Sequence, residues 1–334
     1  MGKIDPPFQE TYKTLFKDCL VRATEGRNLP MVEECELPLI DINRLSWGHP
    51  EREKCITEMA EAASKWGFFQ VINHGIPVEI LERMQYEQMK VFHTSFQNKC
   101  EGNILNLSAN RYLWGNPKAT CLRQFSWSEA FHIPLADISR MGSENRSLRS
   151  TIEAFVQTAA TLAQSIAEIL AENLGVKSKF FAKYCTPSTS YLRMNRYPPC
   201  PFSSEVYGLL PHTDSDFLTI LYQDQIGGLQ LMKDGRWVGV RPNNNPEALV
   251  INIGDLFQAF SNNIYRSVEH RVIAQQEIER FSVAYFFCPS YDAVIESFSK
   301  PAIYRKFSFR EYKQQIQKDL LATGDKIGLS RFLV

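Results

Sequence analysis

The sequence lacks the features that mark charged-surface binders and membrane proteins. Lys+Arg and Asp+Glu both total 37, so the net charge of the 334 residues is zero. A protein that binds nucleic acid or a membrane surface through bulk charge needs an excess of basic residues. The longest apolar run, from Phe281 to Cys288 with one serine, has the length of a strand and is too short to cross a bilayer. We therefore expect neither a nucleic-acid nor a membrane partner.

Paired cysteines are also absent. The eight cysteines are scattered and form no Cys-x-x-Cys motif, which excludes zinc-ribbon and thioredoxin-like sites. No signal peptide is recognisable at the N-terminus. We therefore expect free thiols in a reducing compartment, the cytoplasm, with the nucleus as a second possibility.

No internal repeat or low-complexity linker divides the chain, so we predict one compact unit of the α+β class. Its core, 189–300, is expected to be a double-sheet jelly roll, or double-stranded β-helix, flanked by N-terminal helices. Region 1–135 mixes helices and strands and includes an irregular segment, 100–120, that is typical of a lid or pocket wall. Region 136–188 is helical support, and 301–334 holds a last helix and a polar tail.

Hydrophobic periodicity gives the expected elements. The predicted helices are 7–25, 51–65, from about 77 to 98, 147–175 and 307–318, and the early strands are 37–42, 66–73 and 127–135. Eight short strands with turn residues between them follow, at 190–197, 207–211, 217–223, 229–233, 236–240, 248–253, 269–273 and 280–287.

Two histidines and an aspartate have the spacing of a metal site. His212 and Asp214 are two residues apart, so in a strand both side chains point to the same face. His270 follows Asp214 by 56 residues (270 − 214), on another predicted strand. Two histidines and one carboxylate form the facial triad of non-haem iron(II) oxygenases. Asp216 is a rival ligand, a zinc hydrolase could use the same set, and each histidine alone could be a packed core residue.

A second alternating pair indicates an anion site. Arg280 and Ser282 share one face of a strand, and an arginine that points into a barrel needs a partner. A dissociable organic acid would supply the carboxylate that a guanidinium binds in bidentate fashion. A structural salt bridge to Glu269 or Glu279 is the alternative. Arg193, Asn195 and Tyr197 form a further polar row on one strand face.

The remaining polar candidates are interpreted as structural. We expect His74, His93 and His132 in packing roles, His49 at the surface, Asp255 as a helix N-cap, and Trp127 and Glu129 in a packed strand.

Together these motifs resemble the plant 2-oxoglutarate/iron(II)-dependent dioxygenases. The likeness rests on His212-x-Asp214, His270, Arg280-x-Ser282, the run 195–201 (NRYPPCP) and the run 66–75 (WGFFQVINHG). It implies that His212, Asp214 and His270 bind Fe(II). It also implies that Arg280 and Ser282 bind the distal carboxylate of 2-oxoglutarate, with Tyr197 and Asn195 at its other end. O2 would be the oxidant, ascorbate a supporting reductant, and succinate and CO2 the by-products.

Residues 111–115 and 126–132 are similar to the gibberellin 2-oxidases, closest to the subgroup that acts on twenty-carbon precursors. This resemblance implies hydroxylation of a diterpenoid acid at carbon 2, which inactivates the hormone. Arg111 and Arg123 are candidates for the substrate carboxylate, and Phe286 should face the pocket. The same chemistry on another metabolite such as a flavonoid, or a non-catalytic barrel that binds a small acid, are alternatives. Nothing in the sequence indicates an oligomeric state.

Overall fold

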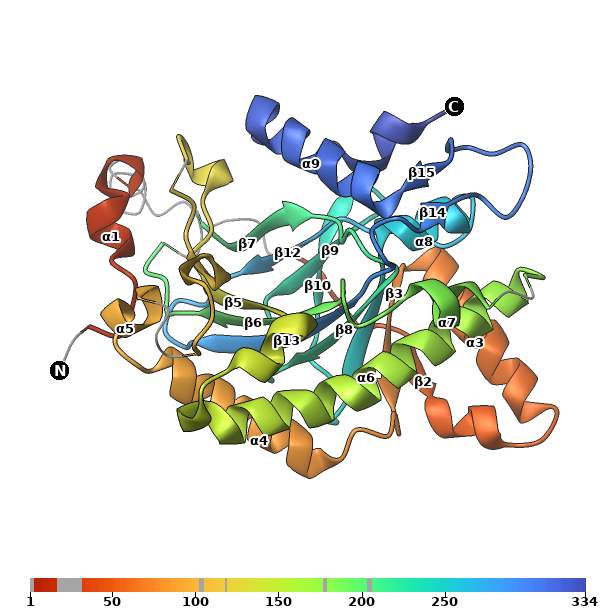
Figure 1. Ribbon diagram of the computed structural model, residues 1–334, viewed down its shortest axis with the longest axis horizontal. Coiled ribbons are helices and arrows are strands. Elements are labelled where there is room, and N and C mark those ends of the chain that lie inside the picture. Colours follow the sequence, from red (N-terminus) through yellow and green to blue (C-terminus); the bar gives the residue numbers. More distant parts are fainter. Residues whose placement is uncertain (1–2, 17–31, 102–104, 118, 177–178, 203–205) are drawn as a thin grey trace.

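Two facing β-sheets form the centre of the protein (Figure 1). The computed structural model describes residues 3–16, 32–101, 105–117, 119–176, 179–202 and 206–334. The large sheet has the order β2 (Leu39–Asp41), β3 (Phe68–Ile72), β11 (Leu249–Ile253), β8 (Leu218–Gln223), β13 (Arg280–Phe287), β6 (Tyr191–Tyr197), β5 (Glu129–Pro134) and β4 (Tyr112–Trp114). The small sheet has the order β1 (Glu34–Cys35), β10 (Arg236–Val240), β9 (Leu229–Lys233), β12 (His270–Ile273) and β7 (Tyr207–His212).

Helices cover the outer face of the large sheet and one end of the barrel. The helices are α1 (Phe8–Thr11), α3 (Glu51–Lys65), α4 (Val78–Phe92), α5 (Phe96–Cys100), α6 (Arg146–Asn173), α7 (Phe180–Tyr184), α8 (Asp255–Phe260) and α9 (Phe309–Thr323). Helix α6 packs against β8 and β13 as well as against α3 and α4. Helix α9 lies on the opposite side of the barrel, next to the short pair β14 (Val294–Ile295) and β15 (Phe307–Ser308) (Figure 1). The predicted α+β jelly roll is therefore confirmed.

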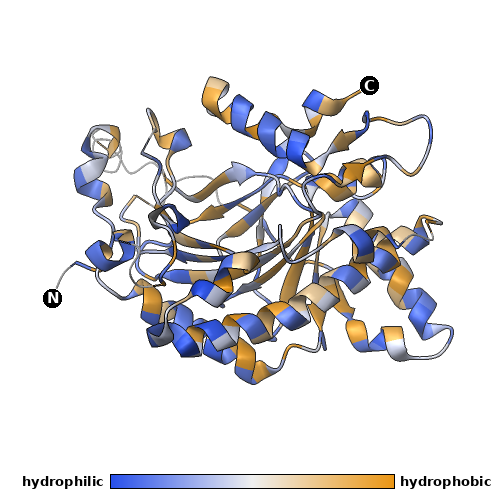
Figure 2. Cartoon of the chain, viewed as in Figure 1, coloured by the Kyte–Doolittle hydropathy of each residue, from blue (hydrophilic) through white to orange (hydrophobic). Residues whose placement is uncertain are grey.

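Strand β13 shows why the sequence folds this way. All eight of its residues are buried, because one face lines the space between the sheets and the other lies under helices. Phe281, Val283, Tyr285 and Phe287 belong to the large hydrophobic core. A strand covered on both faces has a nearly continuous hydrophobic sequence, which explains the longest apolar run in the chain. Figure 2 shows hydrophobic residues both on the central strands and on the helices around them.

The long helix α6 is a core helix. Within the described part of the chain, Ser143–Asn173 is the one helical segment whose length and composition would allow it to cross a membrane, yet 56% of its most apolar window is buried in the structure. Phe155, Leu162 and Ile166 are among the side chains that fill the core. A helix with a wide apolar stripe facing a protein core has this composition without any lipid contact.

The eight strands predicted after residue 189 are all present, with each end within one residue of its predicted position. Elsewhere the structure differs from the elements predicted from the sequence. The helix predicted to end near residue 98 breaks after Phe92 and restarts at Phe96, where Ser95 caps the new helix through Asn98 N. Of the helix predicted over 7–25, the part 17–25 lies outside the described residues.

The C-terminal tail, predicted only as a polar segment after the last helix, is packed against the protein. Its 3₁₀ helix Gly328–Phe332 buries Leu329 and Phe332. The Phe332 ring lies 4.4 Å from the Phe307 ring, and Arg331 pairs with Asp319 at 3.0 Å. The tail is therefore held against α9 and the barrel.

A buried charged network joins the N-terminal region to the large sheet. Glu129 on β5 accepts hydrogen bonds from Lys99 Nζ (2.6 Å), Arg196 Nη1 (2.6 Å) and the Tyr112 hydroxyl. Lys99 and Glu129 are both fully buried. Arg196 also donates to Glu279 (2.7 Å). Glu129 therefore has the predicted structural role, which it fulfils through buried ion pairs with Lys99 and Arg196. Trp127 packs among aromatic rings, also as predicted.

Candidate active site and metal centre

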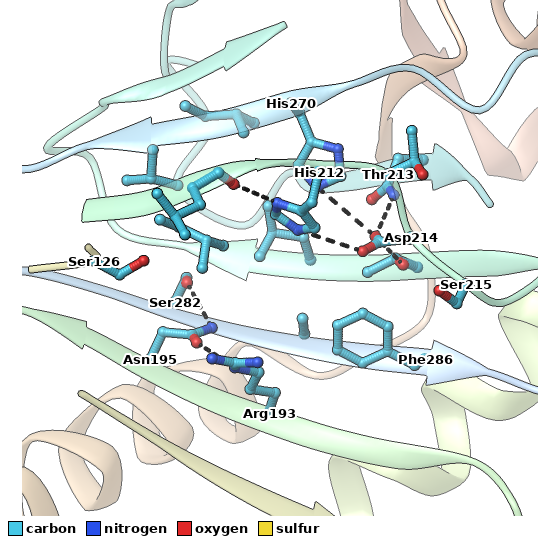
Figure 3. A pocket seen from close by; sticks show the side chains of 18 of the residues that line it. Ser126, Arg193, Asn195, His212, Thr213, Asp214, Ser215, His270, Ser282 and Phe286 are labelled. Atoms are coloured by element: carbon cyan, nitrogen blue, oxygen red, sulfur yellow. Dashed lines mark hydrogen bonds and ion pairs between the residues drawn. The ribbon is translucent and has the colours of Figure 1, made fainter. Parts of the chain in front are cut away.

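A cavity of about 470 Å³ lies between the two sheets (Figure 3). Residues of β7 and β12, from the small sheet, line one side, and residues of β6 and β13, from the large sheet, line the other. This volume is in the usual range for small-molecule sites. The strands therefore bring residues that are far apart in sequence to one cavity.

His212, Asp214 and His270 meet at one side of this cavity. The two histidines are register partners on the neighbouring strands β7 and β12. One potential ligand atom from each of the three residues lies within 4.8 Å of the other two. His212 Nε2 is 3.7 Å from Asp214 Oδ1, and His270 Nε2 is 3.9 Å from Asp214 Oδ2. Three donor atoms that converge at this spacing can hold a single metal ion.

Both imidazole rings are oriented by backbone carbonyls. His212 Nδ1 lies 2.7 Å from the carbonyl oxygen of Leu210, and His270 Nδ1 lies 3.1 Å from that of Val268. A protonated Nδ1 that donates to a carbonyl leaves Nε2 with a free lone pair, as metal-binding histidines require. On Asp214, Oδ2 accepts from Thr219 Oγ1 (2.6 Å) and Asn252 Nδ2 (2.7 Å), which fixes the carboxylate.

The electrostatics of the three residues favour a cation. Burial, reinforced by the adjacent His270, lowers the pKa of His212 to about 3, so its ring is neutral near pH 7. For Asp214, burial alone would raise the pKa, but the two imidazoles and the hydrogen bonds from Thr219 and Asn252 hold it below its usual value. The neutral His212 ring and the ionised Asp214 carboxylate are in the protonation states that bind metals.

Asp216, the rival ligand, lies apart from this group. Its Oδ2 accepts from Thr219 Oγ1 (3.0 Å), and its backbone oxygen accepts from Leu256 N (3.0 Å) in α8. A Cβ on Gly254 would stand 2.2 Å from both the backbone oxygen and Oδ1 of Asp216, so this packing requires the glycine. Asp216 therefore supports the turn between β7 and β8 and is not one of the three converging residues.

Arg280 presents unused donors to the cavity. Its side chain is 1% exposed, and Nε and Nη1 have no hydrogen-bond partner, while Nη2 donates to Gln223 Oε1 (2.6 Å). Within the described residues Arg280 forms no ion pair; Glu279, the predicted alternative partner, pairs with Arg196 instead. A buried guanidinium with two free donors is costly unless an anion binds it.

The neighbouring polar residues lie around Arg280 as the strand alternation predicted. Register pairs join Arg280 to Tyr197 and Ser282 to Asn195 across β13 and β6. The Arg280 guanidinium lies over the Tyr197 ring at 4.9 Å. Asn195 Nδ2 contacts Ser282 Oγ at 3.4 Å (Figure 3). These four side chains form one polar wall that faces the metal-binding group.

The structure brings one of the three predicted substrate residues to the cavity. Phe286 lines it and stacks on Tyr191 with ring centroids 4.4 Å apart. Arg111, in contrast, donates to Asp137 Oδ2 (2.9 Å) and is not among the cavity-lining residues, so that prediction is wrong on position. The Arg123 side chain lies outside the described part of the structure.

Segment 100–120 does not supply the predicted pocket wall. Within its described residues none lines the cavity, and β4 instead pairs with β5 and extends the large sheet. Helix α9 takes that place, because Lys313, Ile316 and Leu320 line the cavity. Sequence reasoning missed this, since an amphipathic C-terminal helix gives no signal of which side chains reach a distant pocket.

Three further cavity residues were also missed or misread. Arg193, predicted as part of a polar row, lines the cavity, and its Nε donates to Asn195 Oδ1 (2.9 Å). His132 was expected to be structural, yet it lines the cavity and lies against Tyr191 at 4.4 Å. Burial, together with the charge of Arg193, lowers the pKa of His132 to about 4, so the ring is neutral. Lys326, from the tail, is the third.

Comparison with known proteins agrees with this geometry. The chain matches the family model of the 2OG-Fe(II) oxygenase superfamily over residues 188–289. It also matches the N-terminal model of the non-haem dioxygenases in morphine synthesis over residues 37–148. The first match contains the three converging residues, Arg280 and Ser282.

Individual relatives extend the likeness over the whole chain. Gibberellin 2-beta-dioxygenase 8 of Arabidopsis thaliana is 55% identical, with 99% of each chain covered. Gibberellin 2-beta-dioxygenase 6 of Oryza sativa subsp. japonica is 47% identical, covering 98% of this chain and 96% of the relative. The crystal structure of JOX2 in complex with 2OG, Fe and JA superimposes with a TM-score of 0.73 at 29% identity, covering 89% of this chain and 93% of JOX2. The chain thus belongs to the gibberellin 2-beta-dioxygenase family of the 2OG-Fe(II) oxygenases, which makes it an enzyme that uses iron(II) and 2-oxoglutarate.

Proposed function

We propose that this enzyme hydroxylates a gibberellin at carbon 2, with a twenty-carbon precursor as its preferred substrate, and so inactivates the hormone. The identity of 55% to gibberellin 2-beta-dioxygenase 8 over nearly the whole of both chains is the observation that carries this proposal. A complete set of converging metal donors, rather than a bare acid-binding pocket, speaks against the alternative of a non-catalytic barrel.

His212, Asp214 and His270 are the residues we assign to iron(II). Their donor set fits it, because two imidazole nitrogens and one carboxylate are the ligand set of non-haem iron(II) oxygenases. Bound iron supplies, with 2-oxoglutarate and dioxygen, the oxidising chemistry that hydroxylates an unactivated carbon. Thr219 and Asn252 hold the Asp214 carboxylate in place before any substrate arrives.

Arg280 and Ser282 are assigned to the distal carboxylate of 2-oxoglutarate, with Asn195 and Tyr197 nearby. The two unpartnered nitrogens of Arg280 suit a carboxylate, and charge-assisted bonds of this kind are about twice as strong as neutral ones. The Tyr197 ring beneath the guanidinium and the Gln223 oxygen beside it leave Arg280 little freedom to turn away. The succinate that forms would leave from the same wall.

The substrate acid is assigned to the part of the cavity near α9. Lys313 on α9 and Arg193 on β6 both line the cavity, and within the described residues Lys313 forms no ion pair. Phe286, Tyr191 and Ile316 give this part an apolar surface. A rigid hydrocarbon skeleton with a carboxylate, such as a gibberellin, matches apolar walls that carry two cations.

Lys313→Met is expected to raise the KM for a gibberellin about tenfold, because a hydrogen bond between charged groups contributes about 1.5–3 kcal/mol. The KM for 2-oxoglutarate and kcat should change little. Steady-state kinetics with each substrate varied in turn measure this. Lys318→Met, an exposed lysine on the same helix, is the matched control. Equal effects of the two substitutions would remove Lys313 from the substrate site.

The substrate class is tested by a turnover panel. Purified enzyme with iron(II), ascorbate and 2-oxoglutarate is offered twenty-carbon gibberellins, nineteen-carbon gibberellins and flavonoids, and succinate is quantified for each. We expect substrate-dependent succinate with the twenty-carbon gibberellins above all. Turnover of flavonoids with none of the gibberellins would replace this proposal by the flavonoid alternative.

A further inference from the structure

Lys326, in the C-terminal tail, contacts the turn that carries two of the three metal-binding candidates. Its Nζ lies 2.7 Å from the backbone oxygen of Thr213 and 2.9 Å from Thr213 Oγ1. Thr213 stands between His212 and Asp214 in the chain (Figure 3). Lys326 is therefore bonded to the residue that lies between the two metal-binding candidates His212 and Asp214.

Asp255, at the start of α8, completes this arrangement. It was predicted to be a helix N-cap, but Gly254 occupies that position and no side chain caps the helix. The Asp255 carboxylate instead accepts from Lys326 Nζ (2.5 Å), the Tyr312 hydroxyl (2.5 Å) and Thr213 Oγ1 (3.1 Å). The backbone N–H of Asp255 donates to the backbone oxygen of Asp214 (2.9 Å). Asp255 is thus bonded to Thr213 through its carboxylate and to Asp214 through its backbone N–H.

The donors of Lys326 are fully used by these contacts. An ammonium group has three hydrogens, and three acceptors lie within 2.9 Å of Nζ. The ion pair is mostly buried, with 15% of the Lys326 side chain and 5% of the Asp255 side chain exposed. Although Lys326 lines the cavity, it has no donor left for a substrate. Its hydrogen bonds are made to the turn that carries His212 and Asp214, and to Asp255.

The tail that carries Lys326 is itself anchored. Gly324 ends α9 in the left-handed conformation, at φ 80°, and turns the chain back toward the barrel. Beyond Lys326 the tail is held by the Arg331–Asp319 ion pair and by hydrogen bonds from Arg305 N to the Phe332 oxygen (2.8 Å) and from Val334 N to the Ile303 oxygen (3.0 Å). The chain is therefore fixed both before and after Lys326, which restricts where its side chain can reach.

We propose that the Lys326–Asp255 pair is a positioning device, through which the C-terminal tail sets the geometry and affinity of the iron site by holding Thr213. This inference rests on the assignment of His212, Asp214 and His270 as the metal ligands. Partners that orient metal ligands from outside the coordination sphere typically change metal affinity by 10–100-fold. Lys326 acts one residue away from two ligands, so its effect belongs at the lower end of that range.

The test measures metal binding, without turnover, on the full-length protein. Co(II), which stands in for iron(II) and absorbs visible light, is titrated into the metal-free wild type and into Lys326→Met, Lys318→Met and His212→Ala. We expect Lys326→Met to bind Co(II) about tenfold more weakly, with a changed absorption band. Lys318→Met should match the wild type, and His212→Ala should lose binding.

A double-mutant cycle separates this role from a general structural one. If Lys326 acts through Thr213, the effects of Lys326→Met and Thr213→Val on Co(II) affinity will not be additive. If Lys326→Met fails to fold, Thr213→Val alone, which removes the Oγ1 contacts to both Lys326 and Asp255, takes its place. Wild-type affinity and spectrum in Lys326→Met, with binding lost in His212→Ala, would overturn the positioning role and leave the ligand assignment intact. Undiminished binding in His212→Ala would overturn the ligand assignment and this proposal with it.

Discussion

Asp214→Ala is expected to abolish substrate-dependent release of CO2 from 2-oxoglutarate and to weaken metal binding by more than about a hundredfold, since even partners outside the coordination sphere cost up to that much. Asp214 is the one carboxylate in the converging group, and its loss leaves only the two imidazoles of His212 and His270. The negative charge that balances the cation would then be missing. Calorimetric titration of a divalent metal, together with a CO2-release assay, measures both effects.

Asp216→Asn is the matched control, because Asp216 is also buried, lies two residues away and shares the Thr219 hydroxyl. It should keep metal binding within a fewfold of the wild type. If Asp216→Asn lost the metal and Asp214→Ala kept it, the rival carboxylate would be the ligand, and the site would have to be rebuilt around it.

Glu129→Gln is expected to reduce the free energy of unfolding by about 3 kcal/mol, because removing one partner of a buried ion pair leaves an uncompensated charge. The substitution would leave one neutral acceptor oxygen for Lys99, Arg196 and the Tyr112 hydroxyl, which now share a charged carboxylate. The network ties α5 to β4, β5 and β6, so its loss affects the outer edge of the large sheet. Urea unfolding, read as a shift in midpoint at constant slope, measures the change.

Glu153→Gln provides the comparison. Glu153 pairs with Arg149 on the surface of α6, where its side chain is 48% exposed. Exposed pairs one helical turn apart contribute about 0.3–0.5 kcal/mol. Similar losses in Glu129→Gln and Glu153→Gln would mean that the buried network is no more important than a surface ion pair.

Much of the site could be predicted because strand alternation is a local property. His212 with Asp214, and Arg280 with Ser282, each lie two residues apart, so a strand must place each pair on one face. The two-face burial of β13 likewise follows from its own sequence. These features need no knowledge of what lies across the barrel.

The pocket wall could not be predicted in this way, because it depends on how distant elements pack. Arg111 is close in sequence to residues typical of the family, but its guanidinium forms an ion pair with Asp137 and does not reach the cavity. Lys313 reaches the cavity only because α9 folds back over the barrel. The role of Asp255 was misread for the same reason, since its partners Lys326 and Tyr312 lie 71 and 57 residues further along the chain. A short-range cap was the simpler inference from sequence.

The position of the new hydroxyl group tests the central proposal most directly. The wild-type enzyme is incubated with a twenty-carbon gibberellin, iron(II), ascorbate and 2-oxoglutarate under labelled dioxygen, and the product is characterised by mass spectrometry and nuclear magnetic resonance. We expect one labelled oxygen at carbon 2 and one succinate for each product formed. A hydroxyl at another carbon, or an unchanged gibberellin, would contradict the proposed function.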